Sequence, residues 1–515
     1  MGCADGPHSF KVTYNASTRT ITESRPQSQS TTSTLSPGDT FFAYLARIVQ
    51  SHNQGHQIRT VTVEGNDVVL PFGFKGGLVG YFGYEMKGES LGAKFQHESA
   101  GNTPDAAFMF VDRFVVFDHI EGGVWAVAIE WDGEEGRTKE WFEGIGQVVR
   151  DGGCREGDPK VNVVRSVSDM PELGKADEKR RKFSYRHPRA TYLSNIAKTQ
   201  TKINDGESYE ICLTTQLRCS LPSSAPDAFT FYTHLRKTNP APYSAYLAFS
   251  STLHIASSSP ERFMKVDADG MMDMKPIKGT VARGATPEED ERRRGALGGN
   301  EKDRAENLMI VDLIRNDLNT ISRPNTVHVP KLMAVESYAT VHQLVSTIRG
   351  HLRPELTAID AIMRSFPPGS MTGAPKLRTV EIMEELEGAP RGVYSGVLGW
   401  IGIDGAAEMS VVIRTAVFDG KGVSVGAGGA IIALSNDVEE WKEVETKLGS
   451  CLPSLTAVYA ADGPDPEPST VDRFEADGQK PDPSTVDHFK TNKNMHRSCG
   501  WTTIWRSLKK QWEAS

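Results

Sequence analysis

The alternation of apolar and polar residues predicts a chain that mixes helices and strands. Apolar residues recur at helical spacing in Thr40–Ser51 and in Tyr192–Asn204, as they do in amphipathic helices. Residues 107–131 alternate apolar and polar positions, and Tyr209–Ser220 is rich in apolar and β-branched residues. Both patterns are typical of strands.

Further elements are expected toward the C-terminal end. Val411–Phe418 and Gly422–Ala433 are apolar runs separated by Asp419-Gly420, which predicts two buried strands joined by a turn. Val311–Ile321 continues a helix that acidic residues open. Residues 22–39 are rich in Ser, Thr and Gln, and we expect a flexible surface loop there.

Composition divides the chain into four parts. Residues 1–150 form an N-terminal region, and the charged, apolar-poor residues 151–189 are expected to be a linker or a long excursion. The pattern is most regular over 190–460, the expected catalytic domain. The tail, 461–515, repeats a Pro-Ser-Thr-Val-Asp segment and is rich in Pro and Asp, so we expect it to be disordered and dispensable for chemistry.

Charge and cysteine usage exclude several classes of protein. The 515 residues carry a net charge of −8, which does not favour binding to nucleic acid. No run of 18 apolar residues exists, so no membrane span is expected. The six cysteines form no C-x-x-C pair, and the N-terminus has no secretory apolar region. A cytoplasmic protein with reduced thiols is therefore expected.

A first candidate for chemistry is Lys278, within Pro276–Thr280. Most lysines are exposed surface amines, and this one could be another. A catalytic role would require a desolvated amine whose pKa falls toward neutrality, which would make it a nucleophile.

Two pairs of acids form a second candidate. Asp303 and Glu306 lie three residues apart on one expected helix, and Glu440 and Glu443 do so on another. This spacing places both carboxylates of a pair on one helix face. Two such faces together would supply the oxygen ligands that Mg²⁺ prefers, but spacing alone favours a solvated face for each pair.

Glycine-rich segments and one arginine form a third candidate. Gly369–Lys376 and Gly426–Gly429 could present backbone N–H groups to an anion. The spacing of a nucleotide-binding P-loop is not met, because Lys376 follows proline and precedes leucine. Arg414 lies in an expected buried strand, where a guanidinium needs an anionic partner from the protein or from a ligand.

Five motifs in order resemble the chorismate-utilising family, which includes anthranilate synthase component I, aminodeoxychorismate synthase component I, and the isochorismate and salicylate synthases. The motifs are Ser259–Phe263, Pro276–Thr280, Asp303–Asp317, Gly369–Lys376 and Gly426–Lys447. The match covers about Ala190 to Leu455 and, less strongly, Phe72 to Glu85. The resemblance implies an α+β fold in which large β-sheets pack face to face with helices outside.

The resemblance also assigns roles around chorismate. It implies that Glu306 and Glu443 bind Mg²⁺, with Asp303 and Glu440 as neighbouring carboxylates, and that the metal holds the ring carboxylate. The resemblance implies that Tyr394, Arg414 and the backbone around Gly428 and Gly429 bind the enolpyruvyl carboxylate. Thr372 and Lys447 match other positions of the substrate pocket. A dicarboxylate in a dry pocket does need a cation at one end and a bidentate donor at the other.

Lys278 distinguishes the subfamilies. Anthranilate synthases resemble one another in having alanine there, whereas aminodeoxychorismate synthases, which make the precursor of para-aminobenzoate and folate, have lysine. The resemblance implies that Lys278 attacks ring C2 while the C4 hydroxyl leaves, and that ammonia then attacks C4 and expels the lysine. Glu261 matches the acid that protonates the hydroxyl, which is a poor leaving group.

Some family features differ or are missing. Gln343 stands where many relatives have histidine, with His342 just before it, and the role of either residue stays open. Asn239–Tyr243 matches half of the family's tryptophan site, but no Leu-Asp-Ser-type motif precedes it, so the N-terminal region of component I type is expected to be incomplete.

The ammonia source leaves alternatives open. No Gly-x-Cys-x-Gly-His turn of a glutamine amidotransferase is found, so a separate glutaminase subunit or domain, or free ammonia, is expected. The alternatives to amination at C4 are an anthranilate or isochorismate synthase on the same scaffold, and a truncated, non-catalytic relative that only binds a partner.

Overall fold

The computed structural model describes residues 2–3, 6–26, 28–53, 57–60, 70–93, 103–119, 123–131, 133–150, 181–222, 225–338, 341–459 and 461–462. The chain divides into two compact units. The first comprises Met1–Gly133 and Arg180–Gly463, and the second comprises Glu134–Lys179 and Pro464–Ser515. Of the second unit, the described part is mainly helix α3 (Glu135–Arg150). Most of the expected linker and almost all of the expected tail lie outside the described residues.

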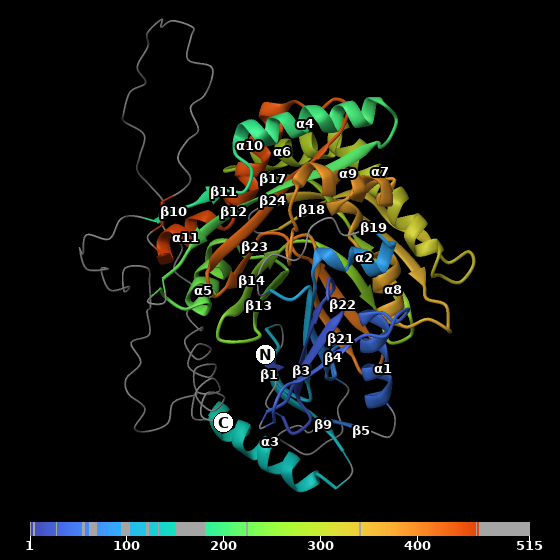
Figure 1. Ribbon diagram of the computed structural model, residues 1–515, viewed down its shortest axis with the longest axis vertical. Helices are drawn as coiled ribbons and strands as arrows, with labels where there is room; N and C mark the ends of the chain where they lie inside the picture. The colour runs from blue at the N-terminus through green and yellow to red at the C-terminus, as the bar shows by residue number, and fades with distance from the viewer. Residues whose placement is uncertain are drawn as a thin grey trace, which may run out of the picture. The chain divides into compact units, whose positions relative to one another are not determined.

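The largest sheet among the described residues of the first unit has twelve strands (Figure 1). It combines segments from residues 10–34, 77–111 and 262–411, so the N-terminal region and the expected catalytic domain share one sheet. Its strands, in spatial order, are β17 (Ile277–Ala282), β19 (Val341–His351), β16 (Met271–Lys275), β15 (Arg262–Val266), β22 (Ala407–Val411), β21 (Val397–Gly402), β6 (Gly77–Phe82), β7 (Ala106–Val111), β2 (Phe10–Asn15), β3 (Thr20–Ser24) and β4 (Thr31–Thr34), with β18 (His328–Ser337) paired to β19.

The second large sheet has seven strands and comes from the C-terminal half. Its spatial order is β11 (Ser184–Tyr185), β12 (Glu210–Ser220), β24 (Gly422–Ile431), β23 (Thr415–Asp419), β14 (Leu253–Ser259) and β13 (Tyr243–Ala248), with β20 (Gly373–Ala374) paired to β12. Two small sheets complete the strands: β1 (Gly2–Cys3), β8 (Arg113–Phe117), β9 (Val124–Glu130) and β5 (Gln57–Thr60) form one, and β10 (Arg181–Lys182) and β25 (Ala461–Asp462) form the other.

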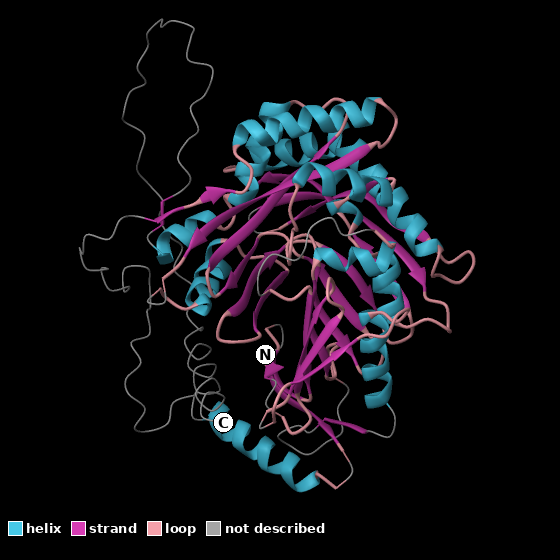
Figure 2. Cartoon of the chain, viewed as in Figure 1, coloured by secondary structure: helices cyan, strands magenta, loops and turns pink. Residues whose placement is uncertain are grey.

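Each large sheet shares a core with its own helices (Figure 2). The twelve-stranded sheet packs against α1 (Phe41–Asn53), α7 (Glu301–Asn319) and α8 (Ala358–Ser365). The seven-stranded sheet packs against α4 (Arg189–Asn204), α5 (Ala228–Thr238), α10 (Asp437–Leu448) and α11 (Leu452–Tyr459). The other helical segments of the first unit are η1 (Tyr84–Met86), α2 (Lys87–Leu91), α6 (Pro287–Gly299), η3 (Gly369–Met371) and α9 (Lys376–Glu387).

A further core joins the two sheets. Tyr81 and Leu398 of the twelve-stranded sheet belong to the same buried cluster as Leu247, Ile255 and Val417 of the seven-stranded sheet. Burial of apolar side chains between two sheet faces is what holds such layers together. The expected α+β fold, with sheets face to face and helices outside, is confirmed.

Most of the expected elements are present, and one segment differs. The helix expected at Thr40–Ser51 is α1, and the strand expected at Tyr209–Ser220 is β12. The flexible loop expected over residues 22–39 was wrong in part, because Thr20–Ser24 and Thr31–Thr34 pair as antiparallel strands. Threonine is β-branched and favours strands even where a segment is polar.

The strand expected over Val411–Phe418 was wrong in part: β23 does pair with β24 as the expected hairpin, but it does not reach back to Val411. Strand β22 ends at Val411 in the twelve-stranded sheet, and β23 begins at Thr415 in the seven-stranded sheet. Between them Arg414 has φ of 50°, a left-handed conformation that no strand continues. The chain therefore crosses from one sheet to the other next to Arg414.

Among the described residues, no helix combines the length and the apolar character that crossing a membrane would require.

Candidate active site

Lys278 is buried at the edge of the twelve-stranded sheet, on β17, with 9% of its surface exposed. Its Nζ lies 2.7 Å from Oε1 of Glu210 and 3.5 Å from Oε2 of Glu306. Gly279 has φ of 80°, and a Cβ there would lie 2.7 Å from Cγ of Asp303. Glycine at this position therefore lets β17 approach the N-terminal end of α7.

Two carboxylates set the pKa of Lys278. Burial alone would lower this pKa, but the negative charges of Glu210 and Glu306 outweigh burial and raise it above its usual value. The fall toward neutrality that a nucleophilic role requires is therefore not provided by this arrangement of charges. The amine is held as an ammonium and must lose a proton before it can act as a nucleophile.

Glu210 is a site residue that the sequence analysis missed. It is the first residue of β12, with 1% of its surface exposed. Its Oε1 accepts the hydrogen bond from Lys278, whereas its Oε2 is buried with no hydrogen-bond partner among the described residues. The sequence did contain a signal for this residue: it is an acid at the start of an apolar strand, and a buried acid needs a charged or hydrogen-bonding partner.

The two pairs of acids lie on α7 and α10, and a lysine joins them. Lys302 Nζ lies 2.9 Å from Oε1 of Glu440 and 3.8 Å from Oε1 of Glu306. The two helix faces therefore lie together. The side chain of Asn436 caps the N-terminus of α10 by accepting from the backbone N–H of Glu439, which fixes the start of the helix.

Glu443 belongs to the same charged cluster. Its Oε1 lies 2.7 Å from Nζ of Lys447, which also donates to the backbone oxygen of Gly428 at 2.6 Å. Burial would raise the pKa of Glu443, but the charge of Lys447 lowers it overall. Burial raises the pKa of Asp303 and of Glu306. Glu443 is thus the acid most firmly held in its charged form.

The balance of charge bears on a metal ion. Five carboxylates share the cluster with three ammonium groups, which leaves an excess of two negative charges. The carboxylates are those of Glu210, Asp303, Glu306, Glu440 and Glu443, and the ammonium groups are those of Lys278, Lys302 and Lys447. Within the described part of the chain, no three metal-binding side chains lie in a ready-made ligand group, because the lysines separate the acids.

Unsatisfied oxygens show that the cluster nevertheless fits a divalent cation. Oε2 of Glu440 is buried with no hydrogen-bond partner among the described residues, and a Cβ at Gly429 would lie 2.8 Å from it. Buried carboxylate oxygens without donors are the kind of ligand that a hard cation prefers. An excess of two negative charges matches the charge of such an ion.

Glu261 follows β14 and is buried, with 6% of its surface exposed. Burial raises the pKa of Glu261 to about 7, while a hydrogen bond from Ser370 and the charges of Lys278 and Arg414 partly oppose the rise. Near pH 7 about half of this carboxyl is protonated. Glu261 can therefore donate a proton, as a general acid must.

Arg414 presents an unpaired positive charge near Glu261. Its guanidinium makes no hydrogen bond or ion pair with another described residue, and its backbone oxygen accepts from Ser258 N at 3.1 Å. The positive charge also lowers the pKa of Tyr394, against the larger effect of burial. A half-buried guanidinium without a carboxylate is suited to binding an anionic ligand.

Glycines shape the wall beside Arg414. A Cβ on Gly426 would overlap the ring of Tyr394, and one on Gly428 would overlap the backbone oxygen of Leu213. Gly428 pairs with Thr214 of β12. These positions are glycine because a ring or a neighbouring strand occupies the space of a side chain.

Thr372 and His342 have internal partners. The hydroxyl of Thr372, which is fully buried, donates to the backbone oxygens of Pro368 and Gly369 at 3.2 and 3.3 Å. His342 Nε2 lies 3.0 Å from Oδ1 of Asp290 on α6, an acid outside the charged cluster.

Comparison with known proteins identifies the family to which this chain is similar. Residues 11–453 match the family model described as chorismate binding enzyme. A protein of Streptomyces pristinaespiralis named aminodeoxychorismate synthase is 40% identical over 463 residues, which are 89% of this chain and 60% of that protein. The chloroplastic aminodeoxychorismate synthase of Arabidopsis thaliana is 44% identical over 73% of this chain and 40% of its own length.

A solved structure gives the same result for the fold. Anthranilate synthase component I from Streptococcus pneumoniae TIGR4 superposes with a TM-score of 0.67 at 26% identity, covering 86% of this chain and 89% of that one. Fold and sequence together define a chorismate-utilising type of protein. The chain belongs to the chorismate-binding enzyme family. It spans less than two thirds of the length of both aminodeoxychorismate synthases above.

Proposed function

We propose that the chain aminates chorismate at C4 to give 4-amino-4-deoxychorismate, on the way to 4-aminobenzoate and folate. The observation that carries the proposal is the position of Lys278, which is buried beside Glu306 and Glu210. A lysine exposed to solvent, away from the acids, would have argued against it. The identity to proteins named aminodeoxychorismate synthase supports the same reaction.

In the proposed mechanism, Lys278 acts as the nucleophile and two acids move protons. Lys278 first gives a proton to Glu210, whose Oε1 lies 2.7 Å away. The neutral amine then forms a bond to ring C2, the ring double bonds shift, and the C4–O bond breaks. Glu261 protonates the departing oxygen, so that water leaves. Ammonia then bonds to C4, the double bonds shift back, and the C2–N bond to the lysine breaks.

The proposal places the two carboxylates of chorismate at opposite ends of the site. Arg414 and Tyr394, with the backbone around Gly428 and Gly429, would bind the enolpyruvyl carboxylate, because this guanidinium pairs with no acid in the described part of the chain. Thr372 and Lys447 complete the proposed pocket. The hydroxyl of Thr372 is tied to its own turn, so its role would be to shape the pocket.

We further propose that Mg²⁺ is the cofactor, with Glu306 and Glu443 as its ligands and Asp303 and Glu440 beside them. The charge excess and the unsatisfied oxygen of Glu440 support this assignment. When bound, such an ion would neutralise and orient the ring carboxylate of the substrate. The protein residues would hold the ring in reach of Lys278.

We propose that ammonia comes from a glutamine amidotransferase subunit or domain, or is taken up free. The greater length of the two aminodeoxychorismate synthases is consistent with an additional domain in those proteins. A cytoplasmic location stays a prediction, and the Arabidopsis thaliana relative is named as chloroplastic.

The product of the reaction tests the proposal most directly. Purified protein is incubated with chorismate, MgCl₂ and ammonium chloride, and products are separated and identified by mass and fluorescence. We expect 4-amino-4-deoxychorismate. Formation of anthranilate, which is fluorescent and has lost the enolpyruvyl group, would overturn the assignment to C4.

Replacement of Lys278 tests the covalent step. We expect Lys278→Ala to lower kcat by at least about 10³-fold, as removal of a nucleophile does in other enzymes, with chorismate binding retained in calorimetry. Lys275→Ala is the matched control, because Lys275 pairs with Glu336 at 2.7 Å outside the site. Turnover by Lys278→Ala equal to that of the control would contradict a covalent role.

A further inference from the structure

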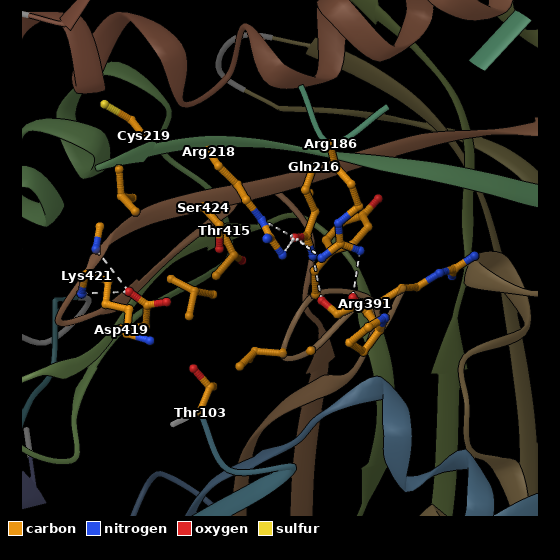
Figure 3. Close-up of a pocket in the computed structure, with 18 of the residues that line it drawn as sticks. Thr103, Arg186, Gln216, Arg218, Cys219, Arg391, Thr415, Asp419, Lys421 and Ser424 are labelled. Atoms are coloured by element: carbon orange, nitrogen blue, oxygen red, sulfur yellow. Dashed lines mark hydrogen bonds between the residues drawn. The ribbon is translucent and has the colours of Figure 1, made fainter. Parts of the chain in front are cut away.

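A polar cavity lies against the face of the seven-stranded sheet that its helices do not cover (Figure 3). Its volume is about 520 Å³, which suits a small ligand. Residues of β11, β12, β24 and β23 line it, together with the segment 390–394. None of the proposed catalytic or metal-binding residues lines this cavity; of the proposed substrate-binding residues, Tyr394 does.

Strand alternation explains why the cavity is polar. Leu217 and Tyr185 pair across β12 and β11 and pack on the helix-covered core. Their neighbours Gln216, Arg218 and Ser184 therefore belong to the opposite face, which lines the cavity. On β23 the same alternation places Ala416 and Phe418 in the helix-covered core, whereas Thr415, Val417 and Asp419 line the cavity.

Two guanidinium groups converge on one amide oxygen in this cavity. Arg186 Nη2 donates to Oε1 of Gln216 at 2.6 Å. Arg218 donates to the same oxygen from Nε at 3.2 Å and from Nη2 at 2.9 Å. The Nε2 of Gln216 donates to the backbone oxygen of Arg391 at 2.7 Å, which orients the amide oxygen toward both arginines.

Neither arginine forms an ion pair with a carboxylate among the described residues, although the more distant charges of Glu387 and Glu85 act to raise the pKa of Arg186 against the larger effect of burial. Asp105 and Asp419 also line the cavity, but Asp105 accepts from Ala16 N at 2.7 Å. Asp419 accepts from two backbone N–H groups of its own turn. Burial lowers the pKa of Arg186 to about 10, with a further contribution from the positive charge of Arg218. Two cations that share one neutral acceptor repel each other, and an anion would relieve this repulsion.

The apolar residues of the cavity indicate that the ligand carries an organic group as well as an anionic one. Val393, Val417 and Val423 line the same cavity, and so does the ring of Tyr394. A guanidinium has five N–H donors, and Arg186 and Arg218 each direct two hydrogen bonds to protein oxygens. Donors therefore remain for a planar carboxylate, next to apolar surface for an organic body.

We propose that this cavity is a second ligand site, which binds a small organic carboxylate through Arg186 and Arg218. No residue of the charged cluster around Lys278 lines this cavity. The site does not depend on the reaction proposed above. A phosphate ester would satisfy the same guanidinium groups, so the two anion types must be compared directly.

Calorimetric titration of the full chain with sodium benzoate, at constant ionic strength, tests the proposal. We expect Arg218→Gln to weaken benzoate binding at least about tenfold, since hydrogen bonds to charged groups are worth this much. Arg218 is exposed, so the variant should fold. Arg236→Gln removes an equal charge from an exposed position on α5 and should bind as the wild type does.

Two further variants separate this cavity from the active site. Gln216→Glu would place an internal carboxylate between the two arginines, so we expect benzoate binding to be lost and the melting temperature to rise. Arg414→Gln should leave this binding intact. Equal affinity in wild type and Arg218→Gln, or loss confined to Arg414→Gln, would overturn the proposal. Inorganic phosphate that binds in place of benzoate would overturn the assignment to a carboxylate.

Discussion

The two polar clusters along strand β12 carry opposite excesses of charge. At its first residue, Glu210, the strand joins a cluster in which carboxylates outnumber ammonium groups. Six residues further on, Gln216 stands between two guanidinium groups that have no carboxylate partner among the described residues. The first cluster contains unsatisfied carboxylate oxygens, whereas the second contains spare N–H donors.

This difference shows how an uncompensated charge indicates the ligand that a site lacks. Partly buried charges are costly unless they are paired, so a fixed excess of one sign favours a ligand of the other sign. The acid-rich cluster accordingly suits a divalent cation, and the arginine pair suits an anion. The same strand serves both because its alternate residues face away from the helix-covered core.

The largest expected effect tests whether the reaction takes place beside the acid-rich cluster, where the charge of Lys278 reaches Glu261. We expect Glu261→Gln to lower kcat by about 10²- to 10⁴-fold, the range for loss of a general acid. The pKa of Glu261 is raised to about 7, so its acid form is present below pH 7 and is lost as pH rises through 7. Wild-type kcat should therefore fall above pH 7, and the variant should lack this limb.

Kcat measured from pH 5.5 to 8.5 checks this prediction. Glu336→Gln is the control, because Glu336 pairs with Lys275 outside the site. If kcat of Glu261→Gln still falls above pH 7, the group whose titration causes this fall is not Glu261.

The next effect tests whether the negative excess serves a cation. We expect Glu306→Gln to weaken Mg²⁺ binding at least about 100-fold, since loss of an indirect partner already costs 10- to 100-fold in metal sites. Calorimetry with MgCl₂ in the absence of chorismate measures it. Glu301→Gln, in the first turn of the same helix but exposed, should bind Mg²⁺ normally. Equal affinity in both variants would rule Glu306 out as a ligand.

The smallest effect sharpens the role of the residue that opens β12. We expect Glu210→Gln to lower kcat about tenfold with little change in KM, since the amide still accepts a hydrogen bond from Lys278 but cannot take its proton. Glu207→Gln changes a nearby acid that pairs with Lys202 and serves as control. An unchanged kcat would show that Glu210 only accepts a hydrogen bond from Lys278 and does not take its proton.

The sequence predicted the local elements and the motif order well, because both depend on short stretches of chain. The acids of α7 and α10 lie on helices whose N-terminal caps and apolar periodicity depend only on residues nearby in the sequence. The resemblance to a family then supplied roles for Lys278 and Glu261 that spacing alone could not provide.

Features that depend on distant segments were missed. The raised pKa of Lys278 is caused by Glu210 and Glu306, which lie 68 residues before it and 28 after it in the chain. The left-handed backbone conformation of Arg414 could not be predicted, because an arginine, unlike a glycine, does not indicate a positive φ. The arginine pair arises from the way β11 pairs with β12, which no local pattern specifies.

The ring of Tyr394 lies flat enough against Gly426 that any side chain there would overlap it, and both residues line the arginine-rich cavity. One aromatic ring thus belongs both to that cavity and to the proposed enolpyruvyl end of the substrate site, where it lies within electrostatic reach of Arg414. A methyl group on residue 426 would displace this ring, so a single substitution there would affect both sites at once.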